Sequence, residues 1–258
     1  MARPDRAPPS PRDTHITIYG RRPVLEAIAD DRLTVDRVII ADNARGDSLA
    51  AIELAAHDHH IEIRRRSATQ VKLIAGNGRH DQGVAADVLA PKMRRLTDFV
   101  EDFTRGGSDP SLLILDGVTN PANVGMILRT ATAAGLDGVV LPSAGVAALG
   151  PLVIKASAGV AFRAPILRCA TAAEALEALT DAGIVVYALA GDRGERLADA
   201  QLAPAAAYLL GNETTGVDPA LHDFVSGWLS IPLHGGVESL NVASAAAVLA
   251  YELERRRN

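Results

Sequence analysis

The chain has 258 residues, 48% hydrophobic and 22% charged, which is enough apolar surface for a buried core and excludes an intrinsically disordered chain. Its net charge of −5 provides no strong basic field, and its 3% of aromatic residues argue against an RNA-binding sheet of stacked aromatics. A single cysteine, Cys169, excludes an intrachain disulfide framework, and no apolar stretch is long enough for a membrane span or a signal peptide, so we expect a cytoplasmic protein.

The first ninety residues divide into a leader and a small domain. Residues 1–14 carry prolines among arginines, so we expect a flexible leader there. Residues 15–90 alternate strand and helix patterns, with Ser67 as a helix N-cap, which predicts a compact α/β domain. Strands are expected at 16–20, 35–41, 61–63 and 83–89, and helices from 21, over 47–57 and over 67–73. Arginine and lysine crowd this part of the chain, which gives either a local basic face or a solvated surface of mixed charge.

Residues 91–110 are the best candidate for a linker between domains. They contain prolines at both ends and the flexible run Gly106-Gly107-Ser108. Within them, residues 96–103 have the pattern of a short helix.

From Ser111 onward, strand and helix patterns alternate again over a second domain, 111–258. Strands are expected at 112–115, 138–141, 165–168, 184–189, 207–210 and 227–231, and helices at 124–134, 172–182 and from 239 to 253. This alternation predicts a mostly parallel α/β sheet with helices on both faces. No Gly-x-Gly-x-x-Gly follows a strand, which argues against a Rossmann dinucleotide site. Gly191 to Gly194 lack that spacing and are interpreted as a surface turn.

Two of these strands run into loops that contain glycine. The strand at 207–210 ends at Gly211-Asn212-Glu213, and the strand at 227–231 leads to Gly235-Gly236. Ser239-Leu240-Asn241 then opens the last helix with polar side chains and free N–H groups. Either loop alone is equally well an ordinary turn, but both beside a helix N-terminus predict a pocket for a small molecule with polar ends.

Three stretches carry a resemblance to a known family. They are Leu-Asp-Gly-Val-Thr-Asn-Pro-Ala-Asn-Val-Gly-Met-Ile-Leu-Arg-Thr (115–130), Leu-Leu-Gly-Asn-Glu-Thr-Thr-Gly (209–216) and Ile-Pro-Leu-His-Gly-Gly-Val-Glu-Ser-Leu-Asn-Val (231–242). In order and spacing they resemble the signature motifs of the SpoU (TrmH-type) RNA 2′-O-methyltransferases. Residues 15–90 resemble the L30e-like substrate-binding domain of such enzymes. The segments 19–27 and 80–86 are similar to the corresponding segments of the subfamily that acts on a guanosine of 23S rRNA, although Asp81 departs from the subfamily pattern.

The resemblance implies transfer of a methyl group from S-adenosylmethionine to a ribose 2′-hydroxyl of RNA, most readily of 23S rRNA, with no metal. It also implies a knotted catalytic domain, a trefoil of the SPOUT type, that pairs into a homodimer whose active site draws on both subunits. The positions that match the family's cofactor site bind through main chain or line the pocket. They are Leu210, Gly211, Ile231, Leu233 and Leu240.

The resemblance also assigns five catalytic candidates. Arg129 matches the family's catalytic arginine, and because a guanidinium with a pKa above about 12 resists deprotonation, we expect it to hold the substrate phosphate and stabilise the oxygen that loses its proton. Asn123 is expected to orient Arg129 or the ribose. Glu213 is expected to pair with Arg129 or to accept the hydroxyl proton, and Ser239 and Asn241 to add polar contacts.

Two other functions are considered. A tRNA 2′-O-methyltransferase of the same family is disfavoured by the first domain, because such enzymes often use basic terminal extensions instead. A catalytically silent RNA-binding or ribosome-assembly factor with the same fold is disfavoured by the intact set of catalytic candidates.

Overall fold

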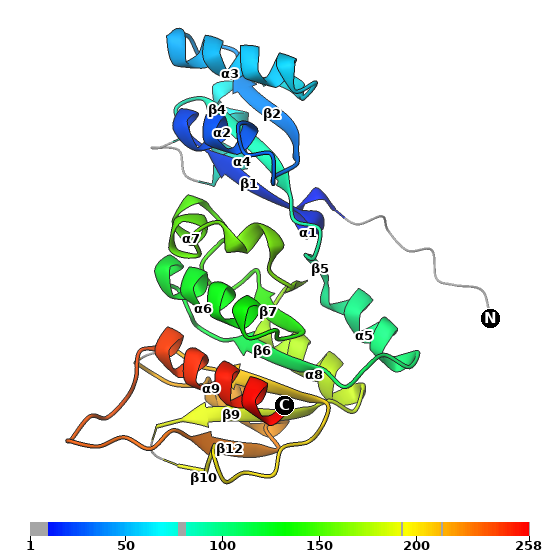
Figure 1. Ribbon diagram of the computed structural model, residues 1–258, viewed down its shortest axis with the longest axis vertical. Helices are drawn as coiled ribbons and strands as arrows, with labels where there is room; N and C mark the ends of the chain where they lie inside the picture. The colour runs from blue at the N-terminus through cyan, green and yellow to red at the C-terminus, as the bar shows by residue number, and fades with distance from the viewer. Residues whose placement is uncertain (1–9, 77–80, 192, 213, 258) are drawn as a thin grey trace. The chain divides into compact units, whose positions relative to one another are not determined.

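The computed structural model describes residues 10–76, 81–191, 193–212 and 214–257 (Figure 1). The chain divides into two compact units. The first unit runs to Pro91 and includes Leu149–Pro151, and the second comprises Lys92–Ala148 and the chain from Leu152 onward. Within the described residues, no helix has the length and apolar character needed to cross a bilayer.

The first unit is a four-stranded sheet covered by helices. β4 lies between β1 and β2 and is antiparallel to both, and β3 pairs in parallel with β2. Its elements are α1 (Pro11–Thr14), β1 (His15–Tyr19), α2 (Arg21–Ile28), β2 (Val35–Ala41), α3 (Asp47–Asp58), β3 (Glu62–Arg66), α4 (Ala68–Ala75) and β4 (Val84–Leu89). The expected strands and helices are therefore present, with ends that differ by a few residues.

Local hydrogen bonds explain where two of its helices begin. The Ser67 hydroxyl accepts from the Gln70 N–H at 3.3 Å and Gln70 Oε1 accepts from the Ser67 N–H at 3.1 Å, which confirms Ser67 as the N-cap of α4. α1 was not expected, because residues 1–14 were assigned to a leader. Asp13 exchanges hydrogen bonds with Ser10, which closes this short turn, whereas residues 1–9 lie outside the described residues.

The second unit is an eight-stranded sheet in which every pairing is parallel, in the order β10-β12-β9-β11-β6-β7-β8-β5. Its strands are β5 (Arg94–Arg95), β6 (Ser111–Leu115), β7 (Gly138–Pro142), β8 (Ile166–Cys169), β9 (Val185–Ala190), β10 (Glu195–Arg196), β11 (Ala206–Leu210) and β12 (Gly227–Ser230). The central strands β6, β7 and β11 are buried almost throughout, as expected for strands with helices on both faces.

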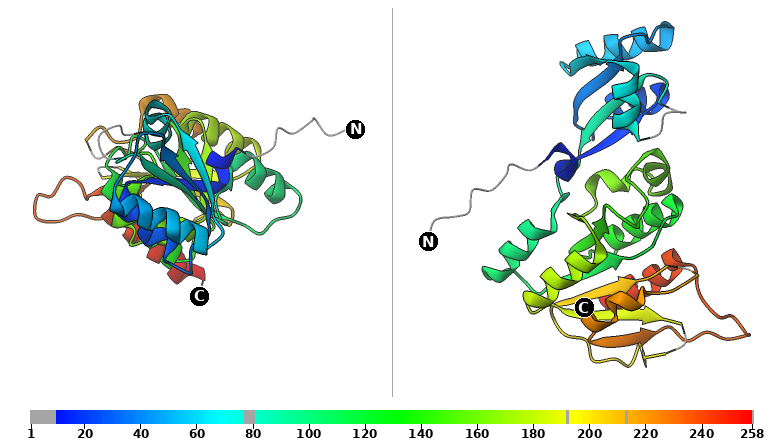
Figure 2. Two further views of the ribbon diagram at one scale, coloured as in Figure 1. Left: turned by 90° about the horizontal axis from the view of Figure 1, so that it is seen from above. Right: turned by 180° about the vertical axis from the view of Figure 1, so that it is seen from behind.

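Two groups of helices cover this sheet. α6 and α9 pack against each other on one face, and α5 packs against α8 on the other, which Figure 2 shows from behind. The helical elements are α5 (Leu96–Thr104), α6 (Pro121–Ala133), α7 (Pro151–Ala156), α8 (Ala172–Asp181) and α9 (Val242–Arg257), with 3₁₀ turns η1 (Val160–Arg163) and η2 (Pro219–Phe224).

The segment expected to be a linker is largely part of this second unit. β5 pairs with β8, and α5 buries Leu96 and Phe99 in the core beneath α8. Leu96 and Phe99 are spaced three residues apart, so one face of the helix is apolar and packs on the sheet. Residues 94–104 are therefore structured, and an interdomain linker is confined to the residues on either side.

Helix α6 begins three residues earlier than the sequence indicated. Asn120 Oδ1 accepts from the Ala122 N–H at 2.9 Å, and Pro121 occupies the first helical position, where its missing N–H costs nothing. As a consequence, Asn123 lies in the first turn of α6 and not in the preceding loop.

The end of helix α9 is held by arginines that reach two separate loops. Arg256 donates to the carbonyls of Leu197 and Ala200, the latter at 2.7 Å. Arg257 donates to the Gly135 carbonyl at 2.6 Å and pairs with Asp137 at 2.9 Å. These contacts fix α9 against the sheet and so fix the direction in which its N-terminus points.

Candidate active site

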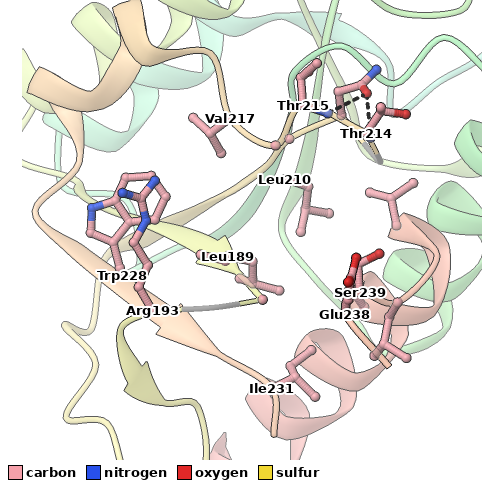
Figure 3. Close-up of a pocket in the computed structure, with 18 of the residues that line it drawn as sticks. Leu189, Arg193, Leu210, Thr214, Thr215, Val217, Trp228, Ile231, Glu238 and Ser239 are labelled. Atoms are coloured by element: carbon pink, nitrogen blue, oxygen red, sulfur yellow. Dashed lines mark hydrogen bonds between the residues drawn. The ribbon is translucent and has the colours of Figure 1, made fainter. Parts of the chain in front are cut away.

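A cavity of about 480 Å³ lies where β9, β11 and β12 end and α9 begins (Figure 3). The three strands are parallel, so their carboxyl ends meet at one edge of the sheet, which is where open α/β sheets bind ligands. The volume is within the range of small-molecule sites. Loops after all three strands contribute to its wall, together with the residues that precede and begin α9.

The cavity wall contains all five residues expected to bind the cofactor: Leu210, Gly211, Ile231, Leu233 and Leu240. Ser239, expected to be catalytic, also lines it. Three separate stretches of sequence therefore meet at one cavity, as the two glycine loops and the helix start predicted.

The loop after β11 is closed on itself. Asn212 and Gly216 exchange two backbone hydrogen bonds of 2.9 Å, and the Asn212 Oδ1 accepts from the Thr214 N–H at 2.8 Å. At Gly211 a Cβ atom would lie 2.3 Å from the backbone of Gly216, closer than atoms can approach. Only glycine fits there, because the two backbone segments are in contact at the cavity wall.

The first signature motif holds this loop through two hydrogen bonds. The Asn212 Nδ2 donates to the Gly117 carbonyl at 2.8 Å, and the Asp218 N–H donates to Asp116 Oδ2 at 3.1 Å. Asp116 and Gly117 follow β6, so the end of β6 fixes the loop that follows its neighbour β11.

The first and third motifs meet through two asparagines. The Asn241 Nδ2 donates to the Asn123 Oδ1 at 3.2 Å, and Asn123 is 2% exposed. The Asn241 Oδ1 accepts from the Ala243 N–H at 2.9 Å and so caps α9. Asn241 follows the cavity residue Ser239 by two positions, so the asparagine pair joins the start of α9, which lines the cavity, to α6.

Arg129 is not brought to this cavity within one chain. It lies exposed on α6, six residues after the buried Asn123, and it is absent from the cavity wall. Glu213 lies outside the described residues. Of the expected catalytic residues, the structure therefore joins Asn123 to Asn241, places Ser239 in the cavity wall and leaves Arg129 on an outer surface.

The sequence analysis missed one side of the cavity. Gly191 and Arg193, interpreted as part of a surface turn, line the wall, and so do Trp228 and Glu238. A Cβ atom at Gly191 would lie 2.9 Å from the Glu238 carbonyl oxygen. The signal was present, because Gly191 follows directly on β9 as Gly211 follows on β11.

The charges on the wall suit a ligand with distinct ends. Among the described lining residues, the charged side chains are Arg193 and Glu238, and they lie on opposite sides of the cavity (Figure 3). The rest of the wall combines apolar side chains, mostly leucine, isoleucine and valine, and glycine backbone with a few uncharged polar side chains. An adenosine with a charged amino-acid tail fits such a wall: apolar side chains for the base, close backbone for hydrogen bonds, and charges at the two sides.

The single cysteine of the chain is not part of the cavity wall. Burial raises the pKa of Cys169 to about 12, so its thiol is neutral, and it lies on β8, away from the cavity. In the part of the chain that the structure describes, no group of three or more histidine, cysteine, aspartate or glutamate side chains is arranged to hold a metal ion.

Two family models match the chain. The SpoU rRNA Methylase family matches residues 110–251, and the RNA 2′-O ribose methyltransferase substrate binding family matches residues 17–93. A relative named 23S rRNA (guanosine-2′-O-)-methyltransferase RlmB, from Xanthomonas axonopodis pv. citri, is 32% identical over 93% of this chain and 96% of its own length.

Solved structures are similar over nearly the whole chain. A putative RNA methyltransferase of the TrmH family from Porphyromonas gingivalis has a TM-score of 0.62 and 27% identity, covering 95% of this chain and 91% of its own. The SpoU methyltransferase AviRb from Streptomyces viridochromogenes, in complex with the cofactor AdoMet, has a TM-score of 0.63 and 25% identity, covering 94% of this chain and 90% of its own.

Proposed function

The chain belongs to the SpoU rRNA methylase family, and from this premise we propose which RNA it modifies and what each site residue does. It is an S-adenosylmethionine-dependent RNA ribose 2′-O-methyltransferase with an RNA substrate-binding domain. We propose that its substrate is a guanosine of 23S rRNA. The observation that carries this proposal is the match to a relative of that name, which extends over both units and not over the catalytic one alone.

We assign RNA binding to residues 15–90 and methyl transfer to residues 111–258. The cavity lies in the second unit, and its wall uses residues 189–245 alone. Among the described residues, the first unit contributes none to that wall, and its match to the substrate-binding family supports the assignment of RNA binding to it. We propose a cytoplasmic location, where ribosomal RNA is present.

The cavity binds the methyl donor through main chain. The sulfonium of the donor supplies an activated methyl group, so the protein has to position an oxygen in line with it. Gly211, Ile231 and Leu240 provide backbone hydrogen-bonding groups, while Leu210 and Leu233 exclude water from the base. The glycine at position 211 supports this assignment, since it lines the cavity with main chain and no side chain.

The asparagine pair positions the reacting ribose. Asn241 caps α9 and donates to Asn123, and these contacts give its side chain a defined direction. Ser239 adds a hydroxyl in the cavity wall. Arg129 holds the RNA phosphate and stabilises the oxygen as it loses its proton, and Glu213 pairs with Arg129 or takes that proton.

We further propose a homodimer formed by α6 and α9. Each helix presents an exposed stripe, and on these stripes Met126 is 41% exposed, Val248 45% and Tyr251 53%. Arg129 lies on the same exposed stripe of α6 as Met126. A dimer that covers this stripe would place Arg129 near an active site. The tethering of α9 to loops at 135–137 and 197–200 supports a knotted C-terminal segment, as the family implies.

Mapping 2′-O-methylation on total RNA from a strain that lacks this gene tests the substrate. We expect one 2′-O-methylguanosine of 23S rRNA to disappear and to return when the wild-type chain is supplied. Loss confined to tRNA would favour the tRNA enzyme, and an unchanged methylation map would favour the silent assembly factor.

A further inference from the structure

Arg193 and Trp228 form a planar pair at one side of the cavity. The Arg193 guanidinium carbon lies 3.9 Å from the centre of the Trp228 ring, over its face. The ring is held in turn by His222, whose ring meets it edge-on at 5.0 Å, and it packs against the hydrophobic core. An exposed arginine is therefore fixed in position by a partly buried aromatic side chain.

The two sides of the cavity differ in chemistry (Figure 3). Arg193 and Trp228 lie on one side, and Glu238 and Ser239 lie on the other. Ser239 is two residues from Asn241, which contacts Asn123, so this second side is where the RNA oxygen has to arrive.

This difference sets the orientation of the methyl donor, given the proposed function on which the inference rests. The reacting methyl has to face the RNA oxygen, which places the sulfonium and the amino-acid tail on the side of Ser239. There the Glu238 carboxylate attracts their positive charges. The adenosine half then extends along the apolar wall toward Arg193 and Trp228.

We propose that Arg193, seated on Trp228, is an adenine-binding residue of this enzyme. A guanidinium stacks on planar aromatic groups and donates in its plane, and adenine has both an aromatic face and ring nitrogens that accept. The indole already restrains the arginine, so the binding of adenine costs less side-chain conformational entropy than it would with an unrestrained arginine. The expected contacts elsewhere in the cavity are made by main chain, so Arg193 supplies a side-chain contact that the motifs do not contain.

Calorimetry with two ligands tests this assignment. S-adenosylhomocysteine carries both the adenosine and the charged tail, whereas 5′-methylthioadenosine lacks the tail. Arg193→Ala is expected to weaken the binding of both ligands by about tenfold, within the range of one cation–π contact in a partly desolvated site. Arg193→Lys is expected to restore binding only in part, since an ammonium group does not stack.

Arg196→Ala is the matched control. Arg196 is three residues further along, is exposed, pairs with Asp199 at 3.6 Å and is absent from the cavity wall. Its removal is expected to leave the affinity for both ligands unchanged. Trp228→Leu tests the stacking contact between the indole and the arginine. In the double variant with Arg193→Ala, the loss of binding free energy is expected to be smaller than the sum of the two single losses. Thermal unfolding of each variant verifies that it is folded.

The outcomes separate this inference from the proposed function. If Arg193→Ala weakened the binding of S-adenosylhomocysteine alone, Arg193 would contact the carboxylate of the tail, and the adenine assignment would be overturned. Unchanged affinity for both ligands would overturn it as well. Additive losses in the double variant would contradict the stacked pair. If the wild-type chain bound neither ligand, the proposed function itself would fail.

Discussion

Arg129 differs from the other described catalytic candidates because it belongs neither to the cavity wall nor to the asparagine pair. Asn123 is buried and accepts a hydrogen bond from the Asn241 side chain, while Ser239 lines the cavity. An exposed arginine is suited to hold a phosphate, which approaches from solvent as part of the RNA. The proposed division of work is therefore positioning by the two asparagine amides and charge stabilisation by Arg129.

Arg129→Ala is expected to lower methyl transfer at saturating RNA by a factor of about a hundred to a thousand, the effect of losing one contact made mainly in the transition state, roughly 3–4 kcal/mol. Affinity for S-adenosylhomocysteine should be unchanged, because Arg129 does not line the cavity. Single-turnover assays with labelled donor measure the first quantity and calorimetry the second.

Arg105→Ala is a suitable control for that experiment. Arg105 is another exposed arginine of the second unit, paired with Glu101 at 3.3 Å, and it has no place in the site. If Arg129→Ala kept more than about a tenth of the wild-type rate, the loss would be much smaller than that expected for an oxyanion contact. The arginine would then have no catalytic part, and Glu213 would be tested next.

At the scale of elements, the loop at 211–217 depends on one side chain. Asn212 uses its amide nitrogen to hold the Gly117 carbonyl and its amide oxygen to hold the Thr214 N–H. The amide thus joins the ends of β6 and β11, and the shape of the cavity wall follows from it.

Asn212→Asp is expected to weaken the binding of S-adenosylhomocysteine by about tenfold or more. The substitution keeps the acceptor but replaces the donor by an oxygen that faces the Gly117 carbonyl, and an unmade buried hydrogen bond costs about 1–3 kcal/mol. Calorimetry measures the affinity. Asn120→Asp is the matched control, because Asn120 only caps α6 and aspartate caps a helix equally well. Equal affinities in the two variants would show that the loop does not need this amide.

The elements also show what sequence patterns were able to predict. Glycine after a strand located the loop at Gly211 because a backbone contact excludes every other residue there. The same pattern at Gly191 was interpreted as a turn, since its glycines lack the spacing of a dinucleotide-binding loop. Arg193 and Trp228 are 35 positions apart in sequence, and the pairing of β12 with both β9 and β10 brings their segments together. Likewise, two residues of β5 carry no strand signal, and their pairing with β8 is a tertiary effect.

At the scale of the whole molecule, the proposed dimer accounts for the exposed apolar side chains of α9. Tyr251→Asp places a charge on that stripe, where burial against a partner would leave it unpaired. Light scattering is expected to give about twice the 27.0 kDa of one chain for the wild type and a single-chain mass for the variant. Methyl transfer should fall with the dimer.

Leu54→Asp controls for a charge introduced at an exposed apolar residue. Leu54 is 64% exposed and lies on α3 of the first unit, so its substitution is expected to leave the mass and the activity of the dimer unchanged. A wild-type chain that is fully active at single-chain mass would remove the dimer from the account.

The central claim is that this chain methylates a ribose of 23S rRNA with the donor bound in the cavity beside α9. Transfer of labelled methyl from S-adenosylmethionine to a 23S rRNA transcript by the purified full chain tests it most directly, with the product located by nuclease digestion and mass spectrometry. We expect label on the 2′-oxygen of one guanosine, and none with Gly211→Val, whose side chain would overlap the backbone of Gly216. Label on a base, or full transfer by the Gly211→Val variant, would contradict the account.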